Sequence, residues 1–312
     1  MTLTIIVPVF NEELAMPIFF EEFKKASTAL PKVAMTVLFV NDGSSDTTLE
    51  VAKDLSKKDN RIKYISLSRN FGKEAAMLAG LKAAKTDLVA IMDVDGQDPF
   101  SMLVEMVEEL KNDENLDVVG SRRVSRKGEP PIRSLCAKIF YKMIQKISHT
   151  KIVDGARDFR VMRLNVVEAI LEMSEVNRFS KGIFAYVGFN TKWLEYENIE
   201  RSAGETKWSF FKLVRYSLSA IVAFSTAPLV FASFVGILFC IISFVVIVFV
   251  VTRALIFGDP TTGWPSMISI VLFVGGIQLF CVGVLGQYLS KTYLESKRRP
   301  TYFIREDNLN DK

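Results

Sequence analysis

The feature that most constrains this chain is a long stretch almost without charge toward its C-terminal end. Residues 216–290 contain only Arg253 and Asp259 as charged side chains, although 24% of the whole chain is charged. Two runs in this stretch, 228–252 and 265–290, contain no charge at all. Each exceeds the roughly 18 apolar residues that mark a membrane-spanning helix. We therefore predict two transmembrane helices within a membrane part at 225–290, rather than two buried helices of a soluble protein.

Basic residues flank these runs on their outer sides. Lys207, Lys212 and Arg215 precede the first run, and Lys291 and 297–299 follow the second, whereas the loop between them has one basic residue. Because positively charged flanks stay in the cytoplasm, we expect both termini, including a tail at 291–312, on the cytoplasmic side. The sequence thus predicts a multi-pass protein of the plasma (inner) membrane.

The first 120 residues alternate between strand-like and helical segments. Apolar runs typical of strands occupy 4–9, 35–40, 62–67, 88–92 and 117–120, and helical stretches occupy 12–29, about 46–57, 72–84 and 101–111. Strands separated by helices indicate an α/β fold with a mostly parallel sheet. In such sheets, ligands bind at the carboxyl ends of the strands.

Several classes of protein are excluded or disfavoured. One histidine and three cysteines leave no Ser-His-Asp triad, cysteine zinc site or disulfide framework. No Gly-x-Gly-x-x-Gly follows the first strand and no Walker lysine loop occurs, which disfavours dinucleotide-binding and P-loop domains. The first 215 residues contain 32 basic and 30 acidic side chains, so we expect no nucleic-acid partner.

Acidic residues stand where two of the predicted strands end. Asp93 and Asp95 follow the strand at 88–92, and Gln97 comes directly after them. Their hard oxygen atoms suit Mg²⁺ or Mn²⁺ shared with a diphosphate, although a capped turn before the next helix is the alternative. Asp42 ends the strand at 35–40 and could accept a hydrogen bond from a uracil imide or a ribose hydroxyl. The alternative for Asp42 is turn formation within Asn-Asp-Gly-Ser.

A basic segment follows the fifth predicted strand. Residues 121–157 contain 10 basic and 2 acidic side chains, which suits a phosphate-bearing lipid or anionic headgroups. We expect Arg122 to face a donor site and Arg133 and Lys138 to face a lipid phosphate; a merely solvated basic face is the alternative. Amphipathic spacing at 135–147 and 206–224 predicts two helices in the membrane interface, with ordinary packing on the sheet as the alternative.

Short motifs at the strand ends now support a resemblance that covers nearly the whole chain. They are PVFNE (8–12), VNDGSSDTT (40–48), SRNFGK (68–73), DVDGQDP (93–99), DFRVM (158–162), RFSKG (178–182) and RSAGETKW (201–208). Together they resemble family 2 glycosyltransferases with the GT-A fold. With two C-terminal spans, the chain is similar to polyprenyl-phosphate glycosyltransferases of the bactoprenol glucosyltransferase type, relatives of dolichol-phosphate mannose synthase. The resemblance implies a cytoplasmic GT-A domain over 1–205.

The resemblance also implies roles for single residues. The nucleoside would be held by Pro8, Glu12 and Asp42. The metal and donor diphosphate would be held by Asp93, Asp95 and Gln97. The phosphates would be contacted by Arg122, Arg201 and Lys207. Asp158 matches a carboxylate proposed as the catalytic base. The acceptor is a phosphate monoester with a second pKa near 6, already a nucleophile at neutral pH, so an orienting role for Asp158 stays open.

The expected activity is that of an inverting glycosyltransferase. It would move a hexosyl unit from a UDP-sugar to undecaprenyl phosphate on the cytoplasmic face and so make a lipid-linked donor for cell-envelope glycosylation. Glucose is favoured, followed by N-acetylglucosamine and galactose. A homo-oligomer is compatible with this activity. One alternative is a membrane polysaccharide synthase, although its Gln-x-x-Arg-Trp motif does not occur here. Another is a non-catalytic partner of a lipid-sugar flippase, which the acidic motifs disfavour.

Overall fold

The computed structural model describes residues 1–123, 153, 155–196, 221–222, 225–257 and 263–309. In the N-terminal part, strands and helices alternate as the sequence predicts. They are β1 (Thr2–Val9), α1 (Ala15–Ala29), β2 (Ala34–Asn41), α2 (Thr48–Lys58), β3 (Ile62–Leu67), α3 (Lys73–Ala83), β4 (Leu88–Ile91), α4 (Phe100–Asn112) and β5 (Val118–Arg123). The later elements are β6 (Ala156–Arg163), α6 (Leu164–Glu172), α7 (Ser180–Tyr186), β7 (Thr191–Tyr196), α9 (Ala227–Phe257), α10 (Trp264–Ser296) and β8 (Ile304–Asp307).

The strands form one sheet in the order β7-β5-β6-β4-β1-β2-β3-β8. The neighbours β4, β1, β2 and β3 run parallel, as do β5 and β7. Strand β6 is antiparallel to both β4 and β5, and β8 is antiparallel to β3. The predicted α/β fold with a mostly parallel sheet is therefore confirmed. Because β6 runs against β4, its N-terminal half lies beside the carboxyl end of β4.

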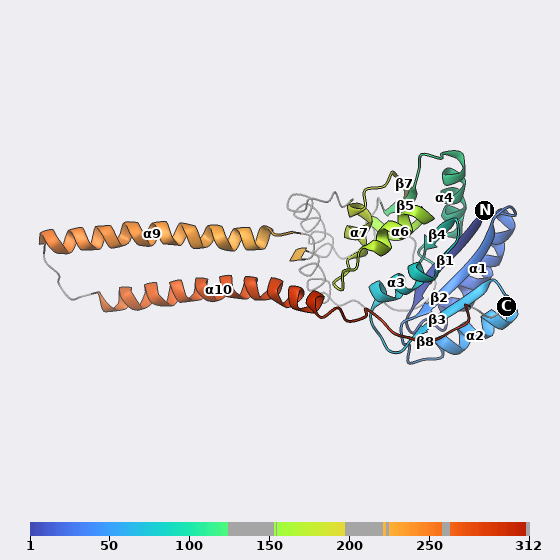
Figure 1. Cartoon of the computed structure of the whole chain (residues 1–312), viewed down its shortest axis with the longest axis horizontal. Helices are drawn as coiled ribbons and strands as arrows, with labels where there is room; N and C mark the ends of the chain where they lie inside the picture. The colour runs from blue at the N-terminus through green and yellow to red at the C-terminus, as the bar shows by residue number, and fades with distance from the viewer. Residues whose placement is uncertain (124–152, 154, 197–220, 223–224, 258–262, 310–312) are drawn as a thin grey trace.

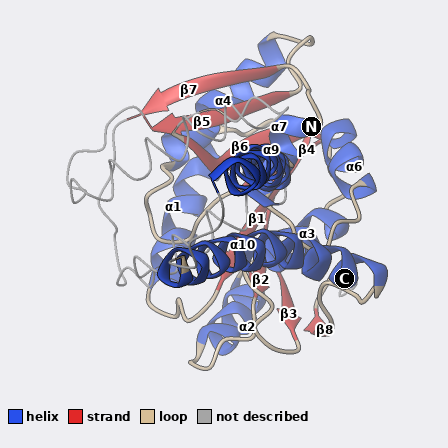
Figure 2. Ribbon diagram, turned by 90° about the vertical axis from the view of Figure 1, so that its left-hand side faces the viewer, coloured by secondary structure: helices blue, strands red, loops and turns tan. Residues whose placement is uncertain are grey.

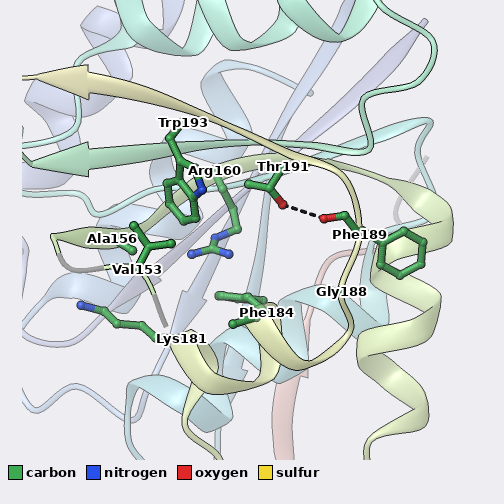
Figure 3. A pocket seen from close by; sticks show the side chains of 10 residues that line it. Val153, Ala156, Arg160, Lys181, Phe184, Gly188, Phe189, Thr191 and Trp193 are labelled. Atoms are coloured by element: carbon green, nitrogen blue, oxygen red, sulfur yellow. Dashed lines mark hydrogen bonds between the residues drawn. The ribbon is translucent and has the colours of Figure 1, made fainter. Parts of the chain in front are cut away.

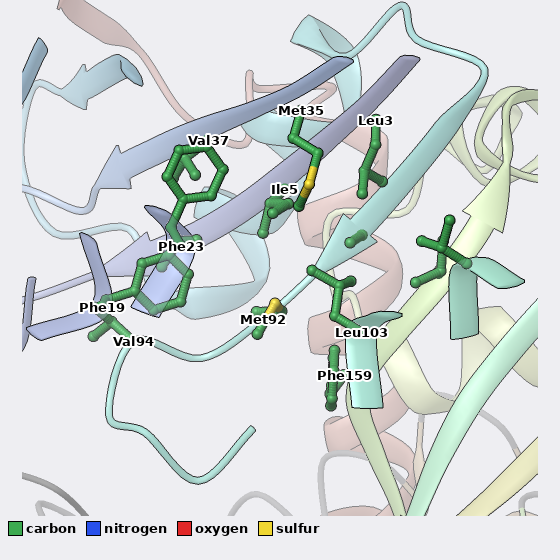
Figure 4. Packing of buried hydrophobic residues seen from close by; sticks show 14 of the residues in the cluster. Leu3, Ile5, Phe19, Phe23, Met35, Val37, Met92, Val94, Leu103 and Phe159 are labelled. Atoms are coloured by element: carbon green, nitrogen blue, oxygen red, sulfur yellow. The ribbon is translucent and has the colours of Figure 1, made fainter. Parts of the chain in front are cut away.

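Apolar side chains fill both faces of the sheet. On one face, Leu3, Ile5 and Val7 of β1 belong to a cluster that α1 and α4 cover, and Ile6 faces the opposite cluster under α3 and α6. Strands buried on both faces consist of almost continuous apolar runs, which is why these segments were recognisable in the sequence. Figure 4 shows aromatic rings of α1 packed against the strands, among them the fully buried Phe23.

The predicted runs 228–252 and 265–290 lie within α9 and α10, so their helical character is confirmed. Both helices are long and apolar enough to cross a membrane, judged by length and composition. They lie side by side and extend away from the α/β domain (Figure 1), and Figure 2 looks along them onto the sheet. Large apolar side chains such as Phe244 and Leu279 are 69% and 74% exposed, which suits a lipid environment better than water.

The end of α10 contacts the α/β domain directly. Glu295 accepts hydrogen bonds from the backbone N–H groups of Val176 and Asn177, at 2.8 Å and 3.1 Å. Lys291 donates to the side-chain oxygen of Asn177 at 2.7 Å. Beyond α10 the chain returns to the sheet, where β8 pairs with β3 and the N–H of Tyr64 donates to Asn308 at 2.7 Å. The predicted tail at 291–312 is therefore partly helix and partly an edge strand.

Two of the predicted features fall on the remaining part of the chain. The interfacial helices expected at 135–147 and 206–224 lie outside the described residues, apart from 221–222. Arg133, Lys138, Arg201 and Lys207 also lie outside them.

Candidate active site

Acidic and basic side chains from distant parts of the sequence meet at one edge of the sheet. The loop 92–99 follows β4, and Asp158 lies on β6 two residues before Arg160, which pairs with Ile91 at the end of β4. Lys73 opens α3, directly after the loop that follows β3. The antiparallel pairing of β6 with β4 therefore places Asp158 next to the predicted metal-binding loop.

Lys73 joins the two acidic elements of this site. Its Nζ lies 2.7 Å from Asp93 Oδ1 and 2.8 Å from Asp158 Oδ2. Burial favours the neutral form of Asp158, but Lys73 and the cations of Lys181 and Arg160 favour the carboxylate more strongly, so the pKa of Asp158 lies well below its ordinary value. Burial opposes the charge of Lys73 as well, yet the two carboxylates outweigh it and raise the pKa of Lys73. Lys73 and Asp158 are therefore both charged at neutral pH.

Internal hydrogen bonds shape the loop that carries the acidic motif. Asp98 is 4% exposed, and its Oδ2 accepts the N–H of Asp93 at 2.9 Å. Asp95 Oδ1 accepts the N–H of Gln97 at 3.1 Å, across Gly96 with a φ of 77°. Burial, together with the charge of Asp93, raises the pKa of Asp98 to about 7. The loop thus presents several oxygen atoms within a few residues.

Arg157 faces this loop from β6. Its Nη2 donates to Gln97 Oε1 at 3.3 Å and lies 3.7 Å from Asp98 Oδ1. The same nitrogen lies 4.0 Å from Asp93 Oδ2. Arg157 therefore offsets part of the negative charge of the loop. Neither Arg157 nor Lys73 was assigned a role from the sequence, although Lys73 ends one quoted motif and Arg157 directly precedes another.

The residues present fit a divalent cation that a substrate helps to hold. Within the described ranges, no three His, Cys, Asp or Glu side chains are grouped so that they could hold a metal ion by themselves. Mg²⁺ is usually bound by one or two carboxylates together with substrate phosphates rather than by a cage of protein ligands. Asp93, Asp95 and the amide oxygen of Gln97 match that pattern as a set of hard oxygen ligands on one loop.

Asp42 has a structural partner that the sequence did not reveal. The side chain is 3% exposed and accepts hydrogen bonds from the N–H groups of Phe71 and Gly72, at 2.7 Å and 2.9 Å. Burial raises the pKa of Asp42, against the effect of these two amides. The turn that was the alternative for Asp42 uses Asn41 instead, whose side-chain oxygen accepts the N–H of Ser44 at 3.1 Å. A nucleoside contact by Asp42 stays a prediction.

The loops after β1 and β2 are joined, which brings Pro8, Glu12 and Asp42 into one region. Pro8 pairs with Val40 across the two strands, and the N–H of Asp42 donates to Val9 O at 2.9 Å. The N–H of Glu12 donates to the hydroxyl of Thr48 at 2.8 Å. Arg122 is the last residue but one of β5, which β4 and β6 separate from β1 in the sheet. Its Nη1 lies 3.6 Å from Glu195 Oε1 of β7 in an exposed pair.

An acidic loop at the strand ends of a mostly parallel α/β sheet is the architecture of a GT-A glycosyltransferase, and comparison with known proteins agrees. Residues 4–171 match the family described as glycosyl transferase family 2. The chain belongs to this family and is a glycosyltransferase.

Curated relatives match over nearly the whole length. A protein named putative glycosyltransferase CsbB, from Bacillus subtilis, is 40% identical over 99% of this chain and 93% of its own. The prophage bactoprenol glucosyl transferase homolog of Escherichia coli is 39% identical over 98% of this chain and 99% of its own. The bactoprenol glucosyl transferase of Shigella phage SfV is 39% identical with the same two shares.

Proposed function

We propose that this protein transfers a hexosyl unit, glucose in the first instance, from a UDP-sugar to undecaprenyl phosphate at the cytoplasmic face of the plasma membrane. The main observation in support of the proposal is the contact of Lys73 with both Asp93 and Asp158. It connects the loop that is expected to bind the donor diphosphate with the carboxylate of Asp158. The long apolar helices α9 and α10 support a lipid acceptor. The names of the E. coli and phage relatives support bactoprenol and glucose.

Each part of the donor would have its own set of residues. Pro8, Glu12 and Asp42 would surround the nucleoside near the ends of β1 and β2. Asp93, Asp95 and Gln97 would hold Mg²⁺ or Mn²⁺, which supplies positive charge to the departing diphosphate. Further cations for the phosphates would come from Arg122, Arg201 and Lys207, and Arg133 and Lys138 would attract the acceptor phosphate.

The reaction needs a nucleophile, and the acceptor phosphate provides it. One phosphate oxygen forms a bond to the anomeric carbon, while the bond from that carbon to the diphosphate oxygen breaks and its electron pair leaves with UDP. Because the phosphate monoester is largely dianionic at neutral pH, no base has to remove a proton. Asp158, kept ionised by Lys73, is therefore better suited to orienting the sugar than to deprotonating the acceptor.

The proposed arrangement in the membrane follows from the order of the parts. The domain over 1–205, both termini and the tail at 291–312 would lie in the cytoplasm, and segments 135–147 and 206–224 would lie in the interface. The lipid-linked sugar would then serve as a donor for cell-envelope glycosylation. A homo-oligomer is compatible with this arrangement.

Product analysis with the purified full chain tests the proposal. The chain is incubated in detergent with undecaprenyl phosphate, Mg²⁺ and each of a panel of UDP-sugars, and the lipid product is identified by mass spectrometry. We expect UDP release and a lipid carrying a single hexose, with UDP-glucose the best donor. Long sugar polymers would favour a polysaccharide synthase. Absence of any product with every donor would favour a non-catalytic role.

A further inference from the structure

A separate cavity lies beside Asp158, on the face of the sheet that α7 covers. It has a volume of about 170 Å³. Figure 3 shows its walls, which come from β6, α7 and β7 and from the chain just before β6. The lining residues that matter here are Val153, Arg160, Lys181, Phe184, Phe189 and Trp193. None of the residues assigned to the donor belongs to this lining.

Arg160 presents a buried cation to this cavity. The residue is only 3% exposed. Its Nε donates to Asp158 O at 3.2 Å, its Nη2 donates to Arg157 O at 2.8 Å, and its guanidinium carbon lies 3.7 Å from the ring centroid of Phe184. Within the described part of the chain, these hydrogen bonds use Nε and Nη2 and leave the Nη1 donors for an occupant of the cavity. A buried guanidinium is stable only when its donors find partners, so an anionic occupant is favoured.

A second cation comes from a different wall of the cavity, formed by α7, whereas Arg160 is on β6. Lys181 lies on α7 and lines the cavity together with Arg160. Its charge is close enough to Asp158 to help lower the pKa of that carboxylate. The remaining lining is mostly apolar or aromatic, with Phe184 on one side and Trp193 on the other, and it includes the hydroxyl of Thr191; the ring of Phe189 points away from the cavity (Figure 3). The cavity thus combines two positive charges with a hydrocarbon-like surface.

This combination selects one class of ligand. A hexose is neutral and would not need two cations. The nucleotide has its own expected site, with the nucleoside at Pro8, Glu12 and Asp42 and the diphosphate at the Asp93–Asp98 loop. A phosphate monoester attached to a hydrocarbon chain satisfies both the cations and the aromatic walls. A cavity of about 150 Å³ can hold benzene, so this one has room for a phosphate or one short apolar group, and the rest of a lipid must extend out of it.

We propose that this cavity receives the phosphate-bearing end of the acceptor lipid, with Arg160 and Lys181 binding the phosphate and the aromatic walls contacting the first isoprene unit. The proposal rests on the proposed function. Lys73 contacts both Asp93 and the carboxylate of Asp158, and the backbone carbonyl of Asp158 accepts a hydrogen bond from Arg160, so β6 connects the donor loop with the cavity at Asp158. The acceptor oxygen would then approach the anomeric carbon from the side away from the leaving diphosphate, as an inverting transfer requires.

The fluorescence of Trp193 gives a test that does not depend on sugar transfer. The chain has three tryptophans, so replacement of Trp208 and Trp264 by phenylalanine leaves Trp193 as the only one. Farnesyl phosphate is titrated into this protein in detergent, with farnesol and inorganic phosphate as separate arms. We expect a saturable change in emission with farnesyl phosphate at far lower concentration than with either fragment. Binding of farnesol as tight as that of farnesyl phosphate would overturn the proposal.

Two lysine variants separate the cavity from a general effect of charge. Lys181→Met should weaken the binding of farnesyl phosphate, and raise the KM for the lipid, by roughly tenfold or more, as expected for the loss of a hydrogen bond to a charged group. Lys192→Met is the matched control, because Lys192 is next to Trp193 in sequence but pairs with Glu109 at 2.6 Å outside the cavity. Equal affinity in Lys181→Met and the unmodified protein, or equal losses in both variants, would overturn the assignment.

Arg160→Lys provides a second variant that keeps the charge and removes the guanidinium donors. Its thermal unfolding is compared with that of the unmodified protein, and we expect a folded protein with a raised KM for the lipid and an unchanged KM for the UDP-sugar. A change in the KM for the UDP-sugar alone would assign the cavity to the donor instead. If farnesyl phosphate binds through Lys181 but no UDP-sugar gives a product, the proposed function fails and the cavity assignment stands. If transfer proceeds and Lys181→Met behaves as the unmodified protein, only the cavity assignment fails.

Discussion

Lys73 contacts the carboxylates of Asp93 and Asp158 at the same time, so its removal leaves two negative groups close together without their cation. We expect Lys73→Met to lower the free energy of unfolding by about 1–3 kcal/mol, less than the loss of a fully buried pair because the lysine side chain is 38% exposed. Transfer should fall as well, because Asp158 loses the group that holds it. Thermal unfolding and product formation measure the two effects.

The control for this variant is a lysine in an ordinary surface pair. Lys25 lies 2.6 Å from Glu22, and its side chain is 73% exposed. Lys25→Met should leave the melting temperature almost unchanged, because exposed ion pairs contribute little to stability. If Lys73→Met is as stable as Lys25→Met, the contact seen in the structure is not important for stability.

Asp95 is the residue at which the proposed metal site can be tested. Asp95→Ala should abolish transfer, because its carboxylate would help to hold the cation that supplies positive charge to the donor diphosphate. EDTA should do the same to the unmodified protein, and Mg²⁺ or Mn²⁺ should restore activity. Binding of Mn²⁺ in the presence of UDP, followed by electron paramagnetic resonance, should weaken in the variant. Asp54→Ala, which removes a carboxylate that is 66% exposed on α2, is the control; full activity in EDTA would exclude the metal site.

At the scale of elements, α3 and α7 are joined through one partly buried carboxylate. Glu74 of α3 accepts hydrogen bonds from the backbone N–H and the hydroxyl of Ser180, at the start of α7. Burial, with the nearby charge of Asp158, raises the pKa of Glu74, against the effect of Ser180. The helix that lines the proposed lipid cavity is therefore held to the helix that begins with Lys73.

The raised pKa of Glu74 gives a prediction with a definite sign. In the folded state Glu74 keeps its proton to a higher pH than in the unfolded chain, so the protein loses stability as pH rises above the ordinary pKa of 4.5. Glu74→Gln has no such proton to lose. The melting temperature of Glu74→Gln relative to that of the unmodified protein should therefore increase as pH rises from 4.5 to the raised pKa of Glu74 in the folded protein. Glu105→Gln, which removes an exposed carboxylate from α4, is the control, and a difference that does not change with pH would contradict the prediction.

The elements that could be predicted from the sequence are those buried on both faces of the sheet, such as β1 and β4, because continuous apolar runs mark them. Strand β6 was missed because Arg157, Asp158 and Arg160 interrupt its apolar pattern. The positions of these charged residues are explained by their contacts in the folded site, which the sequence does not show. Strand β8 has the sequence Ile-Arg-Glu-Asp, with no strand signal of its own, and is defined by pairing with β3 from the far end of the chain.

Only part of the candidate site could likewise be predicted from the sequence. The acidic loop with Asp93 and Asp95 could be predicted locally, because it follows an apolar strand directly. Its contact with Lys73 and Asp158 could not, because that contact depends on the sheet order and on the antiparallel direction of β6. The interaction of Asp42 with the backbone of Phe71 and Gly72 likewise depends on β2 and β3 being neighbours.

At the scale of the whole molecule, the chain leaves the α/β domain, forms two long helices and returns to the same sheet. Glu295 and Lys291 fasten the end of α10 to residues 176–177, and Lys53 of α2 pairs with Glu306 of β8 at 2.7 Å. Because these contacts lie on both sides of the short connection after α10, the helices cannot rotate freely relative to the domain. The domain would therefore hold its strand-end site in a fixed orientation toward the membrane.

This arrangement makes the membrane topology testable at a single residue. The helices α9 and α10 extend from the domain side by side (Figure 1). If both cross the membrane as proposed, the segment between them would lie on the opposite side of the membrane from the domain. We expect Thr261→Cys, in a background without the three native cysteines, to react with a membrane-impermeant thiol reagent in intact cells. Lys32→Cys, on the surface of the α/β domain, should react only after lysis. The reverse pattern would place the domain outside the cell, where UDP-sugars are absent, and would overturn both the topology and the proposed donor.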